Sequence, residues 1–181
     1  MKRVLVMVIH PDLAQSKINK RWVEELSKDE QLFHVHDLYK AYPDGKIDVA
    51  REQALIEAYD HIIFQFPFYW FNCPPLFKTW LDDVLIHGWA FGSKSGYKLE
   101  GKKIALAVSA GIDEEEYQPG AKYKYTLEQL TAPFQLSFEY VKADYQPMFA
   151  FFGAEYHSTT PRIEESATAY INYIRSFAAL Q

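Results

Sequence analysis

Residues 64–92 read FQFPFYWFNCPPLFKTWLDDVLIHGWAFG, and this stretch carries the main evidence for the fold. It starts as an apolar strand, breaks into a loop of prolines and aromatic rings, and continues as an amphipathic helix whose first turn suits Pro75. Loops seldom hold several aromatic rings, because a buried loop leaves backbone groups unpaired. The loop is therefore predicted to lie against a flat apolar ligand.

Strand-like apolar runs alternate with helical patterns along the rest of the chain. The predicted strands are Val4–Ile9, Leu32–Leu38 (nearer an edge), Asp60–Phe66, Lys103–Val108 and Met148–Phe152. The predicted helices are residues 17–27, a helix capped by Asp48 and running to Glu57, the helix that begins at Pro75, and Arg162–Leu180. Such alternation implies parallel βαβ units with helices on both faces of a sheet.

We therefore predict an α/β fold: a flavodoxin-like three-layer sandwich with a five-stranded parallel sheet in the order 2-1-3-4-5. No repeat or linker divides residues 1–181, so one domain is expected. Residues Tyr117–Tyr145 show the least regular pattern and are expected to form an insertion over the ligand face.

The composition narrows the classes of function. A net charge of −5 argues against a general nucleic-acid-binding protein, which normally presents a basic face. The single cysteine, Cys73, excludes an internal disulfide framework and fits a reducing compartment. The first apolar run, Val4–Ile9, is too short for a signal peptide or a membrane span, so a cytoplasmic location is expected.

Metal-dependent and nucleophilic catalysis find little support, and no metal site is predicted. The six histidines show no HExxH spacing, and His34 and His36 on one strand are expected to be a surface pair. No GxSxG sequence is present, and Cys73 precedes Pro74 in an apolar loop.

A ligand of such a sheet lies at the carboxyl ends of the strands, so three loops are expected to converge on one crevice. The first, residues 10–19, is HPDLAQSKIN and leads into a helix. Ser16 suits an N-cap, and the amides of Lys17, Ile18 and Asn19 would offer a phosphate site. The alternatives are that Ser16 only caps the helix and that backbone groups satisfy His10. The absence of the GxGxxG and GxxxxGK motifs argues against a site for a dinucleotide pyrophosphate and against a site for a nucleoside triphosphate.

The second loop supplies the aromatic surface, and the third supplies small residues at its edge. The predicted lining of the second loop is Pro67, Phe68, Tyr69, Trp70 and Phe71, and that of the third is Ser109, Ala110, Gly111 and Ile112. A phosphate at one loop and a flat heteroaromatic ring at the next describe FMN. The alternatives for the aromatic loop are a plug in the core or a dimer contact.

Tyr117 follows an acidic run, Asp113–Glu116, that is expected to be solvated. A phenol near a flavin could donate a hydrogen bond or a proton to a reduced acceptor, so Tyr117 is the candidate catalytic residue. The alternative is an ordinary residue of an amphipathic lid.

With these residues in view, the chain resembles the NAD(P)H dehydrogenase (quinone) family of flavodoxin-like flavoproteins. It is most similar to short bacterial quinone reductases, including ancillary oxidoreductase subunits of glutathione-gated potassium efflux systems. The resemblance covers nearly the whole chain. The residues on which the resemblance rests are His10-Pro11 with Ser16 and Asn19, Leu38-Tyr39 with Tyr42-Pro43-Asp44 and Ile47-Asp48, residues 67–92, and Leu99 with Gly101-Lys102.

The resemblance implies non-covalently bound FMN or FAD, NAD(P)H as hydride donor, and two-electron reduction of a quinone in a ping-pong cycle. It places the flavin phosphate at His10 and at residues 16–19, the ring at residues 68–71, and its polar edge at residues 109–112. It also implies a homodimer whose sites are completed across the interface, for which His87-Gly88-Trp89 and residues 117–145 are the candidates.

Two departures from the family pattern affect these roles. The turn after the fourth strand is Ser109-Ala110-Gly111 where Thr-Gly-Gly is common. Larger relatives have a tyrosine and a histidine as a proton relay, and here Tyr117 matches the tyrosine while Tyr123 lies near the histidine position. Water is therefore an alternative proton source. The chain also lacks the long C-terminal extension of the animal FAD enzymes, which favours FMN.

Three other functions stay open: an electron-carrier flavodoxin, a regulatory subunit associated peripherally with a potassium efflux channel, and an azo- or nitroreductase. The long aromatic loop argues against a carrier, which needs only an exposed flavin edge.

Overall fold

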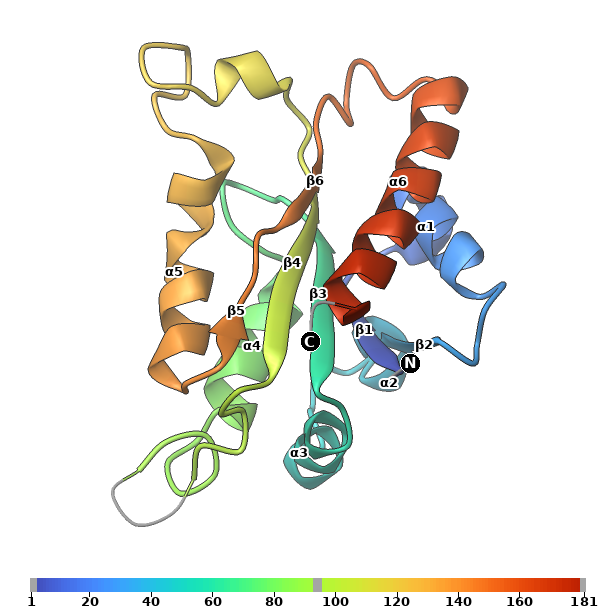
Figure 1. Ribbon diagram of the computed structural model, residues 1–181. Helices are drawn as coiled ribbons and strands as arrows, with labels where there is room; N and C mark the ends of the chain where they lie inside the picture. The colour runs from blue at the N-terminus through green and yellow to red at the C-terminus, as the bar shows by residue number, and fades with distance from the viewer. Residues whose placement is uncertain (1–2, 93–95, 180–181) are drawn as a thin grey trace.

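The computed structural model describes residues 3–92 and 96–179, which form a parallel sheet between two layers of helices (Figure 1). The strands are β1 (Val4–Val8), β2 (Phe33–Asp37), β3 (His61–Pro67), β4 (Lys103–Ser109), β5 (Asp144–Tyr145) and β6 (Phe149–Phe151). Their order is β2-β1-β3-β4-β5, and β6 also pairs with β4. The predicted flavodoxin-like α/β fold and its strand order are confirmed. The order reverses between β1 and β3, where ligands of such sheets bind.

Two groups of helices cover the two faces of the sheet. Helices α1 (Ile18–Leu26) and α6 (Thr160–Ala179) pack on one face, and α3 (Val49–Glu57), α4 (Pro75–Val84) and α5 (Leu127–Tyr140) on the other. Short helical turns α2 (Leu38–Ala41), η1 (Leu13–Gln15) and η2 (Glu114–Glu116) lie in the connections. Asp48 caps α3 as predicted, its side chain accepting from the amide of Arg51.

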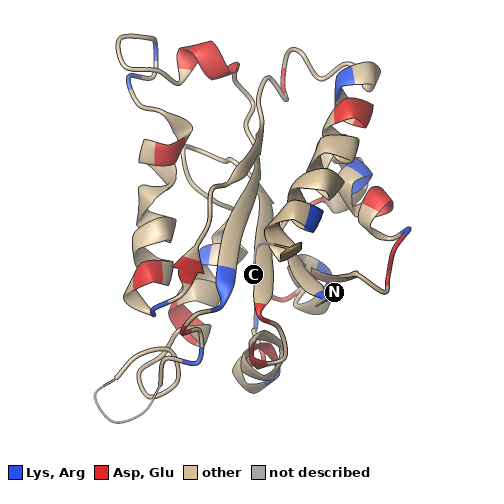
Figure 2. Ribbon diagram, viewed as in Figure 1, with Lys and Arg blue, Asp and Glu red and all other residues tan. Residues whose placement is uncertain are grey.

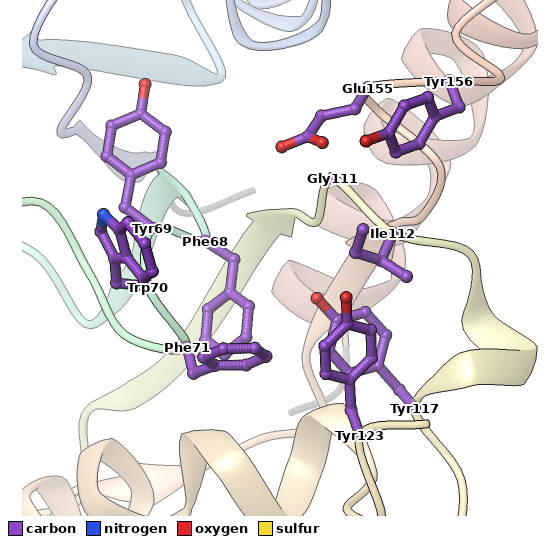
Figure 3. A pocket seen from close by; sticks show the side chains of 10 residues that line it. All are labelled: Phe68, Tyr69, Trp70, Phe71, Gly111, Ile112, Tyr117, Tyr123, Glu155 and Tyr156. Atoms are coloured by element: carbon purple, nitrogen blue, oxygen red, sulfur yellow. The ribbon is translucent and has the colours of Figure 1, made fainter. Parts of the chain in front are cut away.

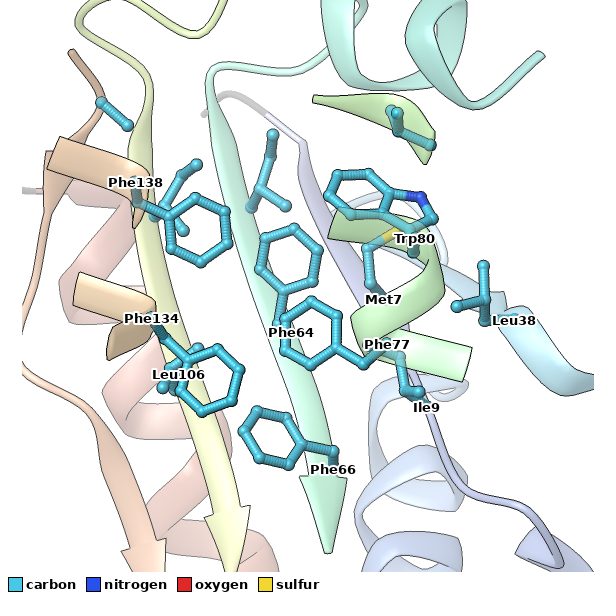
Figure 4. Packing of buried hydrophobic residues seen from close by; sticks show 14 of the residues in the cluster. Met7, Ile9, Leu38, Phe64, Phe66, Phe77, Trp80, Leu106, Phe134 and Phe138 are labelled. Atoms are coloured by element: carbon cyan, nitrogen blue, oxygen red, sulfur yellow. The ribbon is translucent and has the colours of Figure 1, made fainter. Parts of the chain in front are cut away.

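Both faces of the sheet are buried, because alternate residues of each central strand enter different cores. Leu5 and Met7 of β1 join the α4–α5 side, whereas Val4 and Val6 join the α1–α6 side. The larger core is built of stacked aromatic rings (Figure 4). The ring centroid of Phe64 lies 5.0 Å from the centroids of both Phe77 and Phe138. The ring centroid of Phe77 lies 5.5 Å from that of Phe134. Much of the aromatic content therefore stabilises the fold, each buried ring contributing about 1.5–3 kcal/mol.

Three predicted boundaries need correction. The region Tyr117–Tyr145 is not mainly an insertion, because α5 occupies its second half and buries Phe134 and Phe138 in the core. The fifth strand is split into β5 and β6, each paired with β4. The second strand ends at Asp37, whose carboxylate caps α2. The predicted end of the last helix, Leu180, lies outside the described residues. No helix among the described residues has the length and apolar character needed to cross a bilayer.

His34 and His36 are not a surface pair, which corrects another prediction. His36 is buried, and its Nε2 lies 2.9 Å from the Glu52 carboxylate. Glu52 has no exposed surface and also accepts hydrogen bonds from Tyr42 Oη at 2.7 Å and Trp80 Nε1 at 2.9 Å. This carboxylate therefore ties β2, α3 and α4 together beneath the sheet.

The candidate dimer residues 87–89 lie in the loop after the C-terminal end of α4, at the opposite end of that helix from the aromatic loop. Trp89 is buried within its own chain, where its Nε1 donates a 2.7 Å hydrogen bond to Glu57. Trp89 is therefore not free to extend across an interface, whereas His87 remains exposed and contacts Phe91 edge-on.

Candidate functional site

An aromatic cavity of about 600 Å³ lies at the carboxyl ends of β3 and β4 (Figure 3). It is lined by Phe68, Tyr69, Trp70, Phe71, Gly111, Ile112, Tyr117, Tyr123, Glu155 and Tyr156. The structure thus brings together the second and third predicted loops and Tyr117. Glu155 and Tyr156, from the β6–α6 connection, were missed by sequence reasoning, because no local pattern places that loop beside β4.

The first predicted loop lines a neighbouring cavity of about 530 Å³. This second cavity is lined by Ala14, Gln15, Ser16, Lys17, Lys20, Arg21, Glu24, Ser158, Thr160, Ile163 and Glu164. Residues 155–160 run along both cavities, and the convergence of the three loops on one ligand stays a prediction. The rings of His10 and Tyr69, 6.3 Å apart, connect the first loop to the second.

The second cavity includes the start of α1, where the sequence predicts a phosphate site. Ser16 Oγ accepts a 3.1 Å hydrogen bond from the Asn19 amide, as a capping hydroxyl does. The amides of Lys17 and Ile18 have no hydrogen-bond partner in the described part of the chain, so they remain available at the positive end of the helix dipole. Two of the three predicted amide donors are thus free, and that of Asn19 is not.

His10 lies beside this end and is 9% exposed. Its Nδ1 accepts a 3.1 Å hydrogen bond from the Asp12 amide, which leaves Nε2 as the protonated nitrogen of the neutral ring. Burial lowers the pKa of His10, with Asp12 and Asp37 acting in the opposite direction. His10 therefore presents a neutral N–H donor at the end of β1.

A buried amide network joins the two cavities. Asn19 Nδ2 donates to Ser109 Oγ at 2.8 Å, and Gln65 Nε2 donates to both Asn19 O and Asn19 Oδ1 at 3.2 Å. All three residues are buried, so the Asn19 side chain braces the loops instead of facing a ligand. Gln65 was missed by sequence reasoning, although a polar residue inside an apolar strand was the available signal. Its Oε1 is buried and has no hydrogen-bond partner among the residues that the structure describes.

The aromatic loop contains a tight turn in an unfavourable backbone conformation. Trp70 and Phe71 have φ of 51° and 58°, and the Asn72 amide donates to Tyr69 O at 2.9 Å. Two successive left-handed residues without glycine cost on the order of 1–3 kcal/mol each. The turn leaves the Trp70 side chain 90% exposed at the cavity. Such strain at a ligand loop indicates a function for these two rings.

The far side of the aromatic cavity offers backbone donors and a carboxylate. The amides of Gly111 and Ile112 have no hydrogen-bond partner within the described ranges, whereas the Ala110 amide donates to Phe151 O. The Glu155 carboxylate points into the cavity opposite Tyr69 and Trp70 (Figure 3). A Cβ at position 111 would lie 2.8 Å from Glu155 Oε1, so a larger residue there would displace the Glu155 side chain.

Tyr117 and Tyr123 stack with ring centroids 5.4 Å apart, and their hydroxyls lie together facing the cavity. Burial is the main cause that raises the pKa of Tyr117 to about 12, with Tyr123 and the carboxylates of Glu155 and Glu116 adding to it. Tyr117 is therefore a neutral phenol at working pH. Tyr123 is half-buried and occupies the position where a relay histidine was considered.

These features fit FMN. The free amides of Lys17 and Ile18 suit a phosphate, and the free amides of Gly111 and Ile112 suit the polar edge of a flat ring. In residues 3–92 and 96–179, no three His, Cys, Asp or Glu side chains gather as metal ligands. Burial raises the pKa of Cys73 to about 11, which disfavours the thiolate.

Comparison with known proteins identifies the class. A family model described as flavodoxin-like fold matches residues 2–174, and the chain belongs to this family. Among named relatives, general stress protein 14 of Bacillus subtilis (strain 168) is 46% identical over 96% of this chain and 97% of its own length. The uncharacterized NAD(P)H oxidoreductase YrkL of the same organism is 42% identical over 96% and 98%. The glutathione-regulated potassium-efflux system ancillary protein KefF of Klebsiella pneumoniae (strain 342) is 37% identical over 81% of each chain.

Solved structures agree. General stress protein 14 of Treponema denticola, in complex with FMN, superposes with a TM-score of 0.90 at 44% identity, covering 97% of this chain and 99% of that one. An NADPH-quinone reductase of P. pentosaceus gives 0.82 at 29% identity, covering 94% and 96%. The resemblance to the NAD(P)H dehydrogenase (quinone) family is confirmed.

Proposed function

We propose that this protein is an FMN-dependent NAD(P)H:quinone oxidoreductase that catalyses NAD(P)H + H⁺ + quinone → NAD(P)⁺ + quinol. The carrying observation is the aromatic cavity of about 600 Å³ beside free amides at the start of α1. Relatives named NAD(P)H oxidoreductase and NADPH-quinone reductase, and one solved with FMN, support the proposal. FMN held by these residues would supply the two-electron redox chemistry between NAD(P)H and the acceptor, in the ping-pong order that we propose.

The residues of this chain bind, orient and supply a proton. Ser16, Lys17, Ile18 and His10 hold the phosphate, with Asn19 bracing their loop. The rings from Phe68 to Phe71, with Pro67 before them, position the flat ring, and residues 109–112 receive its polar edge. Tyr117 holds a proton on its hydroxyl for the reduced acceptor. FMN is preferred to FAD, and the open slot above the ring admits donor and acceptor in turn.

The proposal also includes a cytoplasmic homodimer with sites at its interface. An ancillary role at a potassium-efflux system is the second candidate function, favoured by the 37% identity to KefF. An electron carrier is less consistent with ten residues lining a substrate-sized cavity.

Purification and turnover test the proposal. The purified protein should be yellow, with a flavin spectrum, and should oxidise NADH or NADPH over many turnovers in the presence of menadione. A single stoichiometric reduction would favour a carrier. Failure to bind flavin even after FMN is added would defeat the proposal.

A further inference from the structure

Glu155 carries the only charge among the ten side chains that line the aromatic cavity. The other lining side chains are aromatic or aliphatic, apart from Gly111. The carboxylate makes no hydrogen bond or ion pair with the described part of the chain. An unpaired negative charge at the wall of a largely apolar slot acts on whatever enters it, because the rings exclude part of the screening water.

Backbone hydrogen bonds hold the segment that carries this carboxylate in place. The amides of Gly153, Ala154 and Glu155 donate to the carbonyls of Ile112, Ala110 and Gly111 at 2.8, 2.9 and 3.0 Å. The segment that carries Glu155 is therefore bonded residue by residue to the loop after β4. The absence of a side chain at Gly111 leaves the space that the carboxylate occupies. The segment is thus fixed to the cavity wall, and its exposed carboxylate projects into the cavity (Figure 3).

The rim adds charge of the same sign. Glu114 and Glu115 are exposed on η2, which lies in the chain between the cavity residues Ile112 and Tyr117. Figure 2 shows η2 as an acidic turn. Glu114 and Glu115 form no ion pair with a described residue. Their neighbours are partly compensated, because Lys122 Nζ lies 3.7 Å from Glu116 and His157 Nδ1 lies 2.8 Å from Asp113.

We propose that Glu155, reinforced by Glu114 and Glu115, makes the cavity select uncharged or cationic aromatic acceptors over anionic ones. This inference rests on the proposed function, since it names the acceptor class of that site. The charge of an anionic acceptor would lie within a few ångströms of the Glu155 carboxylate, and such repulsion reduces binding about fivefold to tenfold at low salt. The nicotinamide ring of the reduced donor is uncharged, so the Glu155 carboxylate does not repel it.

The test compares two quinones that share a ring system, uncharged menadione and the anion 1,4-naphthoquinone-2-sulfonate. FMN-loaded protein is reduced beforehand, and its reoxidation by each quinone is followed in a single turnover, which removes the donor from the measurement. Equilibrium binding of each quinone to the oxidised protein is measured separately by quenching of tryptophan fluorescence. The variants are Glu155→Gln, the double variant Glu114→Gln/Glu115→Gln, and the control Glu30→Gln. Glu30 is an exposed carboxylate just before β2, at the other end of the sheet.

Wild type should bind and reduce menadione about fivefold to tenfold better than the sulfonate at an ionic strength of about 20 mM, and the gap should narrow near 500 mM. Glu155→Gln should reduce the low-salt preference for menadione over the sulfonate. The double variant Glu114→Gln/Glu115→Gln should reduce this preference less, and Glu30→Gln should leave it unchanged. Equal handling of both quinones by wild type at low salt, or a ratio unmoved in Glu155→Gln, overturns the inference.

Two further outcomes keep the inference separate from the proposed function. If menadione fails to reoxidise the reduced wild-type protein, the proposed function fails, while the two binding constants still decide the charge selection. If Glu155→Gln does not retain FMN, the inference is decided by the ratio of menadione binding to sulfonate binding in wild type and in the Glu114→Gln/Glu115→Gln variant. A ratio that changes neither with salt nor in that variant overturns the inference.

Discussion

Asn19 Nδ2 donates a 2.8 Å hydrogen bond to Ser109 Oγ, which joins the first turn of α1 to the last residue of β4. The two residues are 90 positions apart in the chain, and both are buried. This bond fixes the proposed phosphate end of the site relative to the end proposed to receive the ring. The spacing between the two half-sites is therefore set by the protein before any ligand binds.

Asn19→Ala should weaken both stability and FMN binding. The substitution leaves Ser109 Oγ without its partner in a buried region and removes one of the two acceptors of Gln65 Nε2, which costs about 1–3 kcal/mol. Thermal unfolding of the apoprotein and FMN titration by fluorescence measure the two effects. Asn172→Ala, at an exposed position of α6, is the control and should change neither. An unchanged melting temperature in Asn19→Ala would contradict the bracing role.

Trp70→Ala should reduce FMN affinity about tenfold without destabilising the apoprotein. The side chain is 90% exposed, so its removal leaves no cavity in the core, whereas a stacked ring contributes about 0.5–1.5 kcal/mol beyond its buried area. FMN titration and thermal unfolding again separate the effects. Tyr140→Ala removes another exposed ring, on α5 away from the aromatic cavity, and should retain wild-type affinity. Unchanged affinity in Trp70→Ala would remove Trp70 from the site.

Tyr117→Phe should lower kcat for quinone reduction by on the order of 100-fold, the usual effect of losing a positioned proton donor. Because the pKa of Tyr117 is raised to about 12, the phenol stays protonated as pH rises, and kcat of wild type should be flat between about pH 6 and pH 10. Tyr156→Phe is the control, since Tyr156 lines the same cavity but is 72% exposed. A wild-type rate in Tyr117→Phe would assign the proton to water.

Glu52→Gln should lower the free energy of unfolding at pH 7 by about 1–3 kcal/mol, because its partners lose a charged acceptor in a buried setting. Burial raises the pKa of Glu52, but the hydrogen bonds from His36, Tyr42 and Trp80 outweigh it, so the folded pKa is lowered.

The sign of the pH dependence follows from that shift. A carboxyl whose folded pKa lies below its unfolded value stabilises the fold above the unfolded pKa and loses this contribution as pH falls through the folded pKa. The difference between wild type and Glu52→Gln in urea unfolding should therefore be full at pH 7 and shrink below about pH 4.5. Glu165→Gln, exposed on α6, should match wild type throughout. A difference that grows on acidification would contradict the assignment.

The sequence predicted the sheet because its central strands, such as Val4–Val8 and Lys103–Ser109, are buried on both faces and read as continuous apolar runs. Helix α5 escaped prediction because Pro133 interrupts its pattern, although the capping box of Thr126 and Gln129 marks its start. A helix or strand can be predicted from sequence when its apolar residues recur with the period of that element without interruption.

The site was predicted where strand ends meet loops and missed where contacts are remote. The aromatic loop and Gly111 are found from topology alone. Glu155 enters the cavity through backbone bonds between residues 153–155 and 110–112, which leave no trace in either segment. His36 looked exposed because its partner, Glu52, lies 16 residues away on a helix.

The split partner of β4 has a consequence for solubility at high concentration. β5 and β6 are two and three residues long, and Pro147 lies between them without an N–H to donate. A long, flat outer strand is a template on which another molecule can add its own strand, whereas a short and broken one is not. This side of the sheet is thereby protected against edge-to-edge growth into aggregates.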